Sequence, residues 1–95
     1  MIYANILLTV NDPNDIPVIG DLLREQGRLS REEPGCLRFE VYHSTVDATR
    51  FFLCERWEST EALDLHRKAK AYTEIYQPQV LPKVERQGHV CSLIE

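Results

Sequence analysis

Apolar and polar positions alternate along residues 2 to 10, and apolar side chains occur on both sides of the alternation. A period of two is typical of a β-strand, and apolar residues on both sides predict that both faces are covered. Residues 16 to 29 instead repeat apolar positions at intervals of three and four, which predicts a helix of about 16 residues with one apolar stripe. Asp15 is placed to cap this helix, and Pro34 and Gly35 end it, because proline disfavours helical geometry at the residue before it.

The second half of the chain predicts two more strands, a second helix and a last strand. Residues 36 to 44 and 50 to 57 are strand-like and are joined by a short polar loop, so we expect them to form a hairpin. Ser59 is a good N-cap for a helix that runs towards Gln77 and ends before the next proline. A last strand is expected from residue 89 to the end of the chain.

This β-α-β-β-α-β order predicts the ferredoxin-like fold, an α+β arrangement in which a four-stranded antiparallel sheet carries both helices on one face. We expect one domain over residues 1 to 95, because the chain has no linker, repeat or low-complexity segment. The second sheet face would then expose Tyr3, Leu7 and large apolar residues of the hairpin, a larger apolar patch than monomers usually show. We therefore predict a homodimer in which a second copy covers this face.

Charge and composition argue against several partners. Lys and Arg number 11 against 15 Asp and Glu, the net charge is −4, and no basic tract occurs, so we expect no nucleic acid partner. The longest apolar runs are far shorter than the roughly 20 residues that cross a bilayer, and no secretory signal is recognisable, so we expect a cytoplasmic protein with no membrane partner. Cys36, Cys54 and Cys91 lack Cys-x-x-Cys spacing, and we expect them to be buried and reduced. His43 and His89 look solvated and show no metal-ligand spacing with the remaining histidine, so we expect no metal site.

The second predicted helix carries a histidine on its apolar side. On a helical wheel, His66 lies near the middle of a stripe that also contains Ala62, Leu65, Ala69, Tyr72, Thr73 and Tyr76. It is either a core residue bonded to a carbonyl or hydroxyl, which the spacing alone favours, or the centre of a pocket. Its neighbours favour the pocket, because two alanines leave room beside the imidazole and Trp57 ends the adjoining strand. Such a pocket suits a small aromatic ligand, and the imidazole would act as a general base.

Polar residues also interrupt the predicted strands. Asn5 is either an amide bonded at the sheet surface or a donor to a carbonyl or enolate oxygen. Glu40 and Glu55 occur in the hairpin together with Arg38 and Arg56. The simplest interpretation is that these four residues form cross-strand ion pairs at a rim or dimer seam, and the alternative is that they hold the polar end of a ligand.

Three segments carry a family resemblance: "REEPGCLRFEVYHS", "TRFFLCERWESTEALDLH" and "KAYTEIY". Together they resemble the antibiotic biosynthesis monooxygenase (ABM) domain family, over essentially the whole chain. The resemblance implies a dimeric α+β barrel built from two ferredoxin-like protomers. One departure is that Lys70 and Ala71 stand before Tyr72, where many members have a second histidine, so a proton relay that needs two imidazoles on this helix is in question.

The resemblance also implies an activity. Family members oxygenate hydroquinones, anthrones or related polycyclic phenols with molecular oxygen and without a metal or flavin. We therefore expect a cofactor-independent monooxygenase acting on a small aromatic or quinol-type substrate, in which His66 removes a phenol proton, Asn5 stabilises the anion and the anion reduces oxygen in a dry pocket. In the haem-degrading branch an Asn, a Trp and a His form the site, and Asn5, Trp57 and His66 look like their counterparts. The expected substrate-binding residues are Tyr72, Tyr76, Leu65 and Ala69.

Three alternatives stay open at this point. One is a haem-degrading enzyme, in which case haem would be bound. Another is an isomerase of a phosphorylated autoinducer-type dione, whose phosphate would need cations from among Arg38, Arg56, Arg67 and Lys68. The last is a stress-response domain that binds a small molecule without catalysis, because sites rather than folds carry function.

Overall fold

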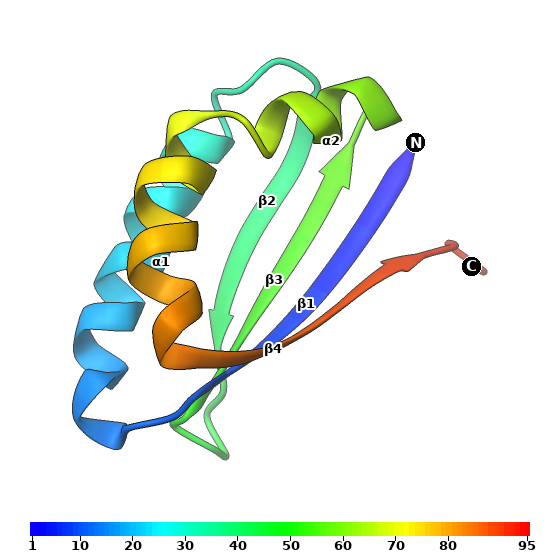
Figure 1. The fold of residues 1–95 in the computed structure, drawn as a ribbon. Coiled ribbons are helices and arrows are strands. Elements are labelled where there is room, and N and C mark those ends of the chain that lie inside the picture. Colours follow the sequence, from blue (N-terminus) through cyan, green and yellow to red (C-terminus); the bar gives the residue numbers. More distant parts are fainter.

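The computed structural model describes residues 1–95 and contains one four-stranded antiparallel sheet in the order β2-β3-β1-β4. Its strands are β1 (Ile2–Val10), β2 (Cys36–His43), β3 (Arg50–Trp57) and β4 (Val84–Cys91), and its helices are α1 (Ile16–Ser30) and α2 (Thr60–His66). Shorter or irregular helical segments are η1 (Pro13–Asp15), η2 (Ala71–Val80) and η3 (Leu81–Lys83). The helical segments lie on one side of the sheet (Figure 1), so the predicted ferredoxin-like α+β fold is confirmed. None of the helices is long and apolar enough to span a membrane.

The predicted ranges of the first three strands agree with β1, β2 and β3 to within one residue. The prediction for the last strand is wrong in its start, because β4 begins at Val84 rather than at residue 89. Nearly all residues of β4 are exposed, and this strand lies at the edge of the sheet. An edge strand of this kind has no alternating apolar pattern that a sequence could reveal.

The second helix is not continuous, contrary to the prediction from Ser59 to Gln77. The helix α2 does begin as predicted, because the hydroxyl oxygen of Ser59 accepts a hydrogen bond from a backbone N–H in the first turn. It ends at His66, and the next residues form tighter turns with bonds from Lys68 N–H to Leu65 O and from Ala69 N–H to His66 O. One helical wheel therefore cannot describe α2 and η2 together.

The segment η2 continues past a proline that was expected to end it. Pro78 lies inside η2, which is π-helical from Ala71 to Val80, and its ring nitrogen has no hydrogen to donate to the backbone. The side-chain amide of Gln79 donates to the carbonyl oxygen of Glu74 at 2.9 Å. The wider turns of the π-helix carry the chain past the proline to Val80.

The core lies between the sheet and the helices. The residues of β1 and β3 that face the helices alternate with residues that face the other way, and the buried set includes Ile6, Leu8, Val10, Phe51, Leu53 and Trp57. We call the other side of the sheet the open face, formed by Tyr3, Asn5, Leu7, Thr9, Arg38, Glu40, Tyr42, Phe52, Cys54 and Arg56. Tyr42, Phe52 and Leu7 lie in one row across the open face, and Tyr42 and Phe52 are 47% and 40% exposed.

The cysteines are less buried than predicted. Cys36 and Cys54 are half-buried, and Cys91 is exposed, with no disulfide between them. Cys54 and Cys91 lie opposite Asn5 and Tyr3 of β1, so both belong to the side of the sheet that no helix covers. In a single chain nothing covers Cys54 and Cys91, whereas Cys36 lies opposite Trp57 and is half-buried at the start of β2.

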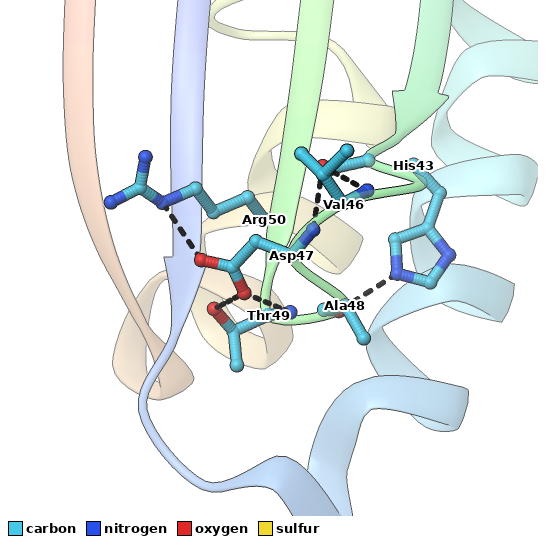
Figure 2. Close-up of polar contacts among 7 residues, drawn as sticks. His43, Val46, Asp47, Ala48, Thr49 and Arg50 are labelled. Carbon is cyan, nitrogen blue, oxygen red and sulfur yellow. Dashed lines mark hydrogen bonds and ion pairs between the residues drawn. The ribbon is translucent and has the colours of Figure 1, made fainter.

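The loop between β2 and β3 is held together by Asp47. One carboxylate oxygen, Oδ1, accepts hydrogen bonds from the backbone N–H and the hydroxyl of Thr49 at 3.0 and 2.7 Å, and Oδ2 lies 3.2 Å from Arg50 Nε (Figure 2). His43 is exposed, as predicted, and its ring stacks on Phe51 with 4.2 Å between ring centroids. These contacts define the turn and hence the register of the hairpin.

Candidate active site

A cavity of about 140 Å³ lies between the sheet and the segments α1, α2 and η2. It is on the helix-covered side, because β1 contributes Ala4 and Ile6, which belong to the buried set of that strand. The polar side chains that line it include Gln26, Glu55, His66, Arg67, Tyr76 and Arg86. The cavity thus combines apolar walls with a few polar groups, as small-molecule sites do.

His66 lies at the centre of a group of aromatic side chains. Its ring centroid is 4.4 Å from that of Trp57, 5.6 Å from that of Tyr72 and 5.8 Å from that of Phe39. The ring of Tyr76 is next to Tyr72, with 5.2 Å between their centroids. These contacts enclose the imidazole, which is only 3% exposed, and fix the plane of its ring.

Burial also sets the charge of the imidazole. The pKa of His66 is lowered because burial disfavours the imidazolium, although the charge of Glu55 partly opposes this effect. The Nδ1 atom lies 2.7 Å from Oε1 of Glu33, whereas no protein group bonds Nε2. His66 therefore presents a neutral ring with one free nitrogen, which is the form that accepts a proton.

The turn between α1 and β2 brings Glu33 to this histidine. Gly35 has a φ of +79°, and a Cβ at this position would lie 2.5 Å from the Cβ of Ala62 in α2. Only glycine therefore permits both the backbone conformation and this close approach. The carbonyl of Gly35 also accepts a hydrogen bond from Glu58 N–H at 2.8 Å, which joins the turn to the start of α2. Glu33 and His66 meet because the two segments pack this tightly.

Glu55 is a cavity residue, and the prediction that it forms a cross-strand ion pair is wrong. Its neighbours across the sheet are Phe39 and Ala4, and its Oε1 accepts a hydrogen bond from Trp57 Nε1–H at 2.9 Å. Burial raises the pKa of the Glu55 carboxyl. The sequence did contain a signal for this position. Glu55 lies two residues from both Leu53 and Trp57, so the period of a strand places it on the same apolar side as they are.

The other three residues of that prediction lie on the open face. Arg38 bonds Glu40 within β2 rather than across strands, with Arg38 Nε donating to Glu40 Oε1 at 2.7 Å. Arg56 lies opposite Arg38 and places its guanidinium over the ring of Tyr3, 5.0 Å from the centroid. None of these groups reaches the cavity.

Arg86 and Gln26 are among the cavity residues that the sequence alone did not indicate. Arg86 of β4 donates from Nε to the hydroxyl oxygen of Tyr76 at 3.0 Å, and its guanidinium lies over Gly88, where a Cβ would be 2.6 Å from Nη1. The glycine therefore makes room for a cation at the cavity. Gln26 of α1 is buried, and its Oε1 has no hydrogen-bond partner in the protein. Gln26 lies within the apolar stripe of α1, so the sequence indicates that it is buried but not that it borders a cavity. The sequence of β4 is mostly polar, so nothing in it distinguishes Arg86.

The expected ligand-binding residues are only partly brought together. Tyr72 and Tyr76 line the cavity with His66, as predicted. Leu65 is 59% exposed and does not line the cavity, whereas Leu63 does. Ala69 is half-buried and does not line the cavity, because α2 ends before it.

Of the three expected catalytic residues, the structure brings two together. Trp57 contacts His66, whereas Asn5 is exposed on the open face, opposite Cys54 of β3 and His89 of β4. The sheet therefore separates Asn5 from the imidazole. Among the cations considered for a phosphate, only Arg67 lines the cavity.

Comparisons with known proteins agree with this architecture. Among solved structures, Rv0793 from Mycobacterium tuberculosis has 27% sequence identity and a TM-score of 0.86 and is matched over 100% of this chain and 97% of its own. An antibiotic biosynthesis monooxygenase structure has 22% identity and a TM-score of 0.86, over 98% of this chain and 99% of that one. PA3566 from Pseudomonas aeruginosa has 20% identity and a TM-score of 0.78, over 97% and 95% of the two chains. These likenesses support the fold.

The family itself is identified by sequence. A search of curated proteins gave no match. The model of the antibiotic biosynthesis monooxygenase family, however, matches residues 1–77, which is well over half of the chain and includes β1 to β3, α2 and His66. The chain therefore belongs to the antibiotic biosynthesis monooxygenase family.

Proposed function

We propose that this protein is a cofactor-independent monooxygenase that acts on a small aromatic or quinol-type substrate with molecular oxygen. The observation that carries the proposal is the environment of His66. Its imidazole is buried among aromatic rings, lines a cavity, has a lowered pKa and keeps Nε2 free. A neutral imidazole that lines a cavity beside cationic groups is suited to removing a proton from a phenol.

The size and lining of the cavity support a small ligand. Its volume of about 140 Å³ is close to that of an engineered apolar cavity of about 150 Å³ that binds benzene. Tyr72 and Tyr76 provide aromatic walls, and the unpaired amide oxygen of Gln26 offers an acceptor for a ligand donor such as a hydroxyl. A single-ring phenol fits this description better than haem does, since haem is several rings wide.

The proposed mechanism starts with proton transfer. The phenol O–H bond breaks, a bond forms between the proton and Nε2 of His66, and the electron pair stays on the phenolate oxygen. Arg86 and Arg67 line the same cavity, and their positive charges stabilise this anion. They take the role that sequence analysis gave to Asn5. The anion, rather than a bound metal or flavin, then gives one electron to oxygen, and the resulting substrate radical and superoxide combine to a peroxide. This peroxide takes the proton back from His66 and loses water, so one oxygen atom stays in the product and the other leaves as water.

One observation favours a second candidate function. Arg67 and Arg86 together place two cations at the cavity, which is what a phosphorylated dione would need in an isomerase. The same histidine would then move a proton next to a carbonyl group. An assay for isomerisation of a phosphorylated dione, run beside oxygen uptake, separates the two activities.

The proposal includes a homodimer formed through the open face. Tyr42 and Phe52 expose large parts of their rings beside Leu7, and burying such a patch against a second copy is favourable. Light scattering on the purified chain at micromolar concentration tests this step. A mass corresponding to one chain would count against it.

Oxygen uptake is the direct test of the activity. The purified protein is incubated with hydroquinone, substituted hydroquinones and anthrone, and the parent is compared with His66→Ala. We expect the substitution to lower kcat by about 100-fold or more, the usual effect of removing a general base. His43→Ala is the matched control, because His43 is exposed and lies outside the cavity. An active His66→Ala variant would rule out the proposed role, and an inactive parent would direct attention to the isomerase assay.

A further inference from the structure

We infer that Glu33 is a positioning residue for His66. It accepts a hydrogen bond from Nδ1–H and thereby makes Nε2 the nitrogen that takes the substrate proton. This inference rests on the proposed function, because it assigns a role within the same site.

The geometry is that of a paired carboxylate and imidazole. Oε1 of Glu33 lies 2.7 Å from Nδ1 of His66, and the two side chains are 14% and 3% exposed. An ionised carboxylate has acceptors only, so Nδ1 must carry the proton of the neutral ring when Glu33 is charged. The lone pair of Nε2 is then directed at the cavity, where the substrate hydroxyl would lie.

The position of Glu33 is determined by backbone contacts on both sides. Its N–H donates to Ser30 O, at the end of α1, at 3.1 Å, and its carbonyl accepts from Cys36 N–H, at the start of β2, also at 3.1 Å. Gly35 packs the same turn against α2, which carries His66. The pair is therefore held by three elements of the fold and needs no rearrangement when substrate binds.

The carboxylate has a second effect during the reaction. When Nε2 takes the phenol proton, the ring becomes an imidazolium, and the negative charge of Glu33 next to Nδ1 stabilises it. Burial raises the pKa of Glu33 to about 7, so the charged form predominates only above this pH. Around the pair, Glu55 and Arg67 also face His66, and Cys36 lies near Glu33. We therefore expect activity to rise with pH on an acid limb near neutrality.

Glu33→Gln tests the role in turnover. An amide can donate its N–H to Nδ1, which favours the tautomer with the proton on Nε2 and leaves no base in the cavity. We expect kcat to fall by about 100-fold, with KM changed by less than about threefold, because substrate contacts stay intact. The acid limb should move to lower pH, because only His66, with its lowered pKa, still titrates. Glu33→Asp, which keeps the charge, should recover part of the lost kcat.

Glu32→Gln is the matched control. It makes the same change of charge one residue earlier, on an exposed side chain with no contact to His66. Thermal unfolding of all variants shows whether a loss of activity reflects a loss of fold. If Glu33→Gln keeps a kcat within about threefold of that of Glu32→Gln, the positioning role is wrong.

Nitrogen NMR of the His66 imidazole provides a readout that needs no substrate. At pH 8 we expect the parent to carry its proton on Nδ1 and Glu33→Gln to shift it to Nε2, with the His66 signals assigned by their loss in His66→Ala. A parent that holds the proton on Nε2 would overturn the inference. A parent that holds it on Nδ1 but consumes no oxygen would leave the pairing supported and refute the proposed activity.

Discussion

Neighbouring residues of the same β-hairpin experience opposite environments on the two faces of the sheet. Glu55 lies under the helices, and burial raises its pKa, whereas Glu40 lies on the open face, where hydrogen bonds from Tyr42 and Arg38 lower its pKa. Both residues are glutamates one strand apart. The face, rather than the type of residue, therefore decides whether the pKa of a carboxyl group is raised by burial or lowered by hydrogen bonds.

The two faces also differ in the kind of interaction that they favour. On the helix-covered face, His66, Glu55 and Arg86 line a partly open cavity. On the open face, Tyr42 and Phe52 form part of a broad surface, and neither lines a cavity. A concave site suits a small molecule, and a broad apolar surface suits another protein. We expect chemistry on the first face and association on the second.

Truncating one adjacent side chain on each face should give the largest difference. Leu53 is 1% exposed under the helices, and Leu53→Ala should lower the free energy of unfolding by about 2–5 kcal/mol. Phe52→Ala, on the open face, should cost less at low protein concentration. A dimer becomes more stable as the protein concentration rises, and Phe52→Ala would weaken the dimer. The loss of unfolding free energy caused by Phe52→Ala should therefore grow with protein concentration, as measured by urea unfolding at several protein concentrations. A cost that does not depend on concentration would contradict the proposed association.

Neutralising one glutamate on each face should produce opposite pH dependences. The raised pKa of Glu55 means that its neutral form contributes stability below about pH 4.5, and this contribution is lost as pH rises through the folded pKa. Glu55→Gln keeps an uncharged group that can still accept from Trp57, so its Tm relative to the parent should rise by a few degrees between pH 4 and pH 8. His66, Arg67 and Arg86 face this carboxyl and reduce the effect.

Glu40→Gln should show the reverse dependence and a smaller change. The lowered pKa of Glu40 means that its charged form contributes stability above about pH 4.5, and this contribution is lost as pH falls. The variant should therefore be slightly less stable than the parent at neutral pH and equal to it in acid. Water screens this exposed group, so the shift in Tm should be small. Parallel pH profiles for the two variants would remove the distinction between the faces.

Much of the fold could be predicted from sequence because its signals are local. The alternation in β1 and the apolar stripe of α1 each reflect one element packed against one core, and both were found within a residue or two. The break after His66 could not be predicted, because no proline or glycine marks it and the tight turns at Lys68 and Ala69 lie inside a regular apolar stripe. The start of β4 was missed because pairing with β1, rather than burial of its own side chains, makes it a strand.

The site was harder to predict than the fold. The sequence pointed to His66 and Trp57 because both stand among apolar residues at regular spacing, and the structure places their rings in contact. Glu33 and Arg86 come from a turn and an edge strand, and they reach the site only through the packing of separate segments. Asn5 was expected at the same site, and the structure places it on the open face. A polar residue in an apolar strand indicates a special position, but alternation alone does not say which of the two faces the helices cover.

The smallest effect is expected for Asn5→Ala, and it is also the sharpest test of which face of the sheet carries the substrate. Asn5→Ala should leave kcat/KM within about twofold of the parent, because an exposed side chain across the sheet from the cavity makes no contact with the substrate. Oxygen uptake measures kcat/KM. If the parent shows no turnover, titration with hydroquinone followed by the fluorescence of Trp57, the only tryptophan, compares ligand binding instead. Thr9→Ala, also on the open face, is the control for a general effect of truncation there. If Asn5→Ala lowered turnover as strongly as His66→Ala while Thr9→Ala did not, the reacting group would have to contact the open face. The cavity beside His66 would then not be the only place where the substrate is held.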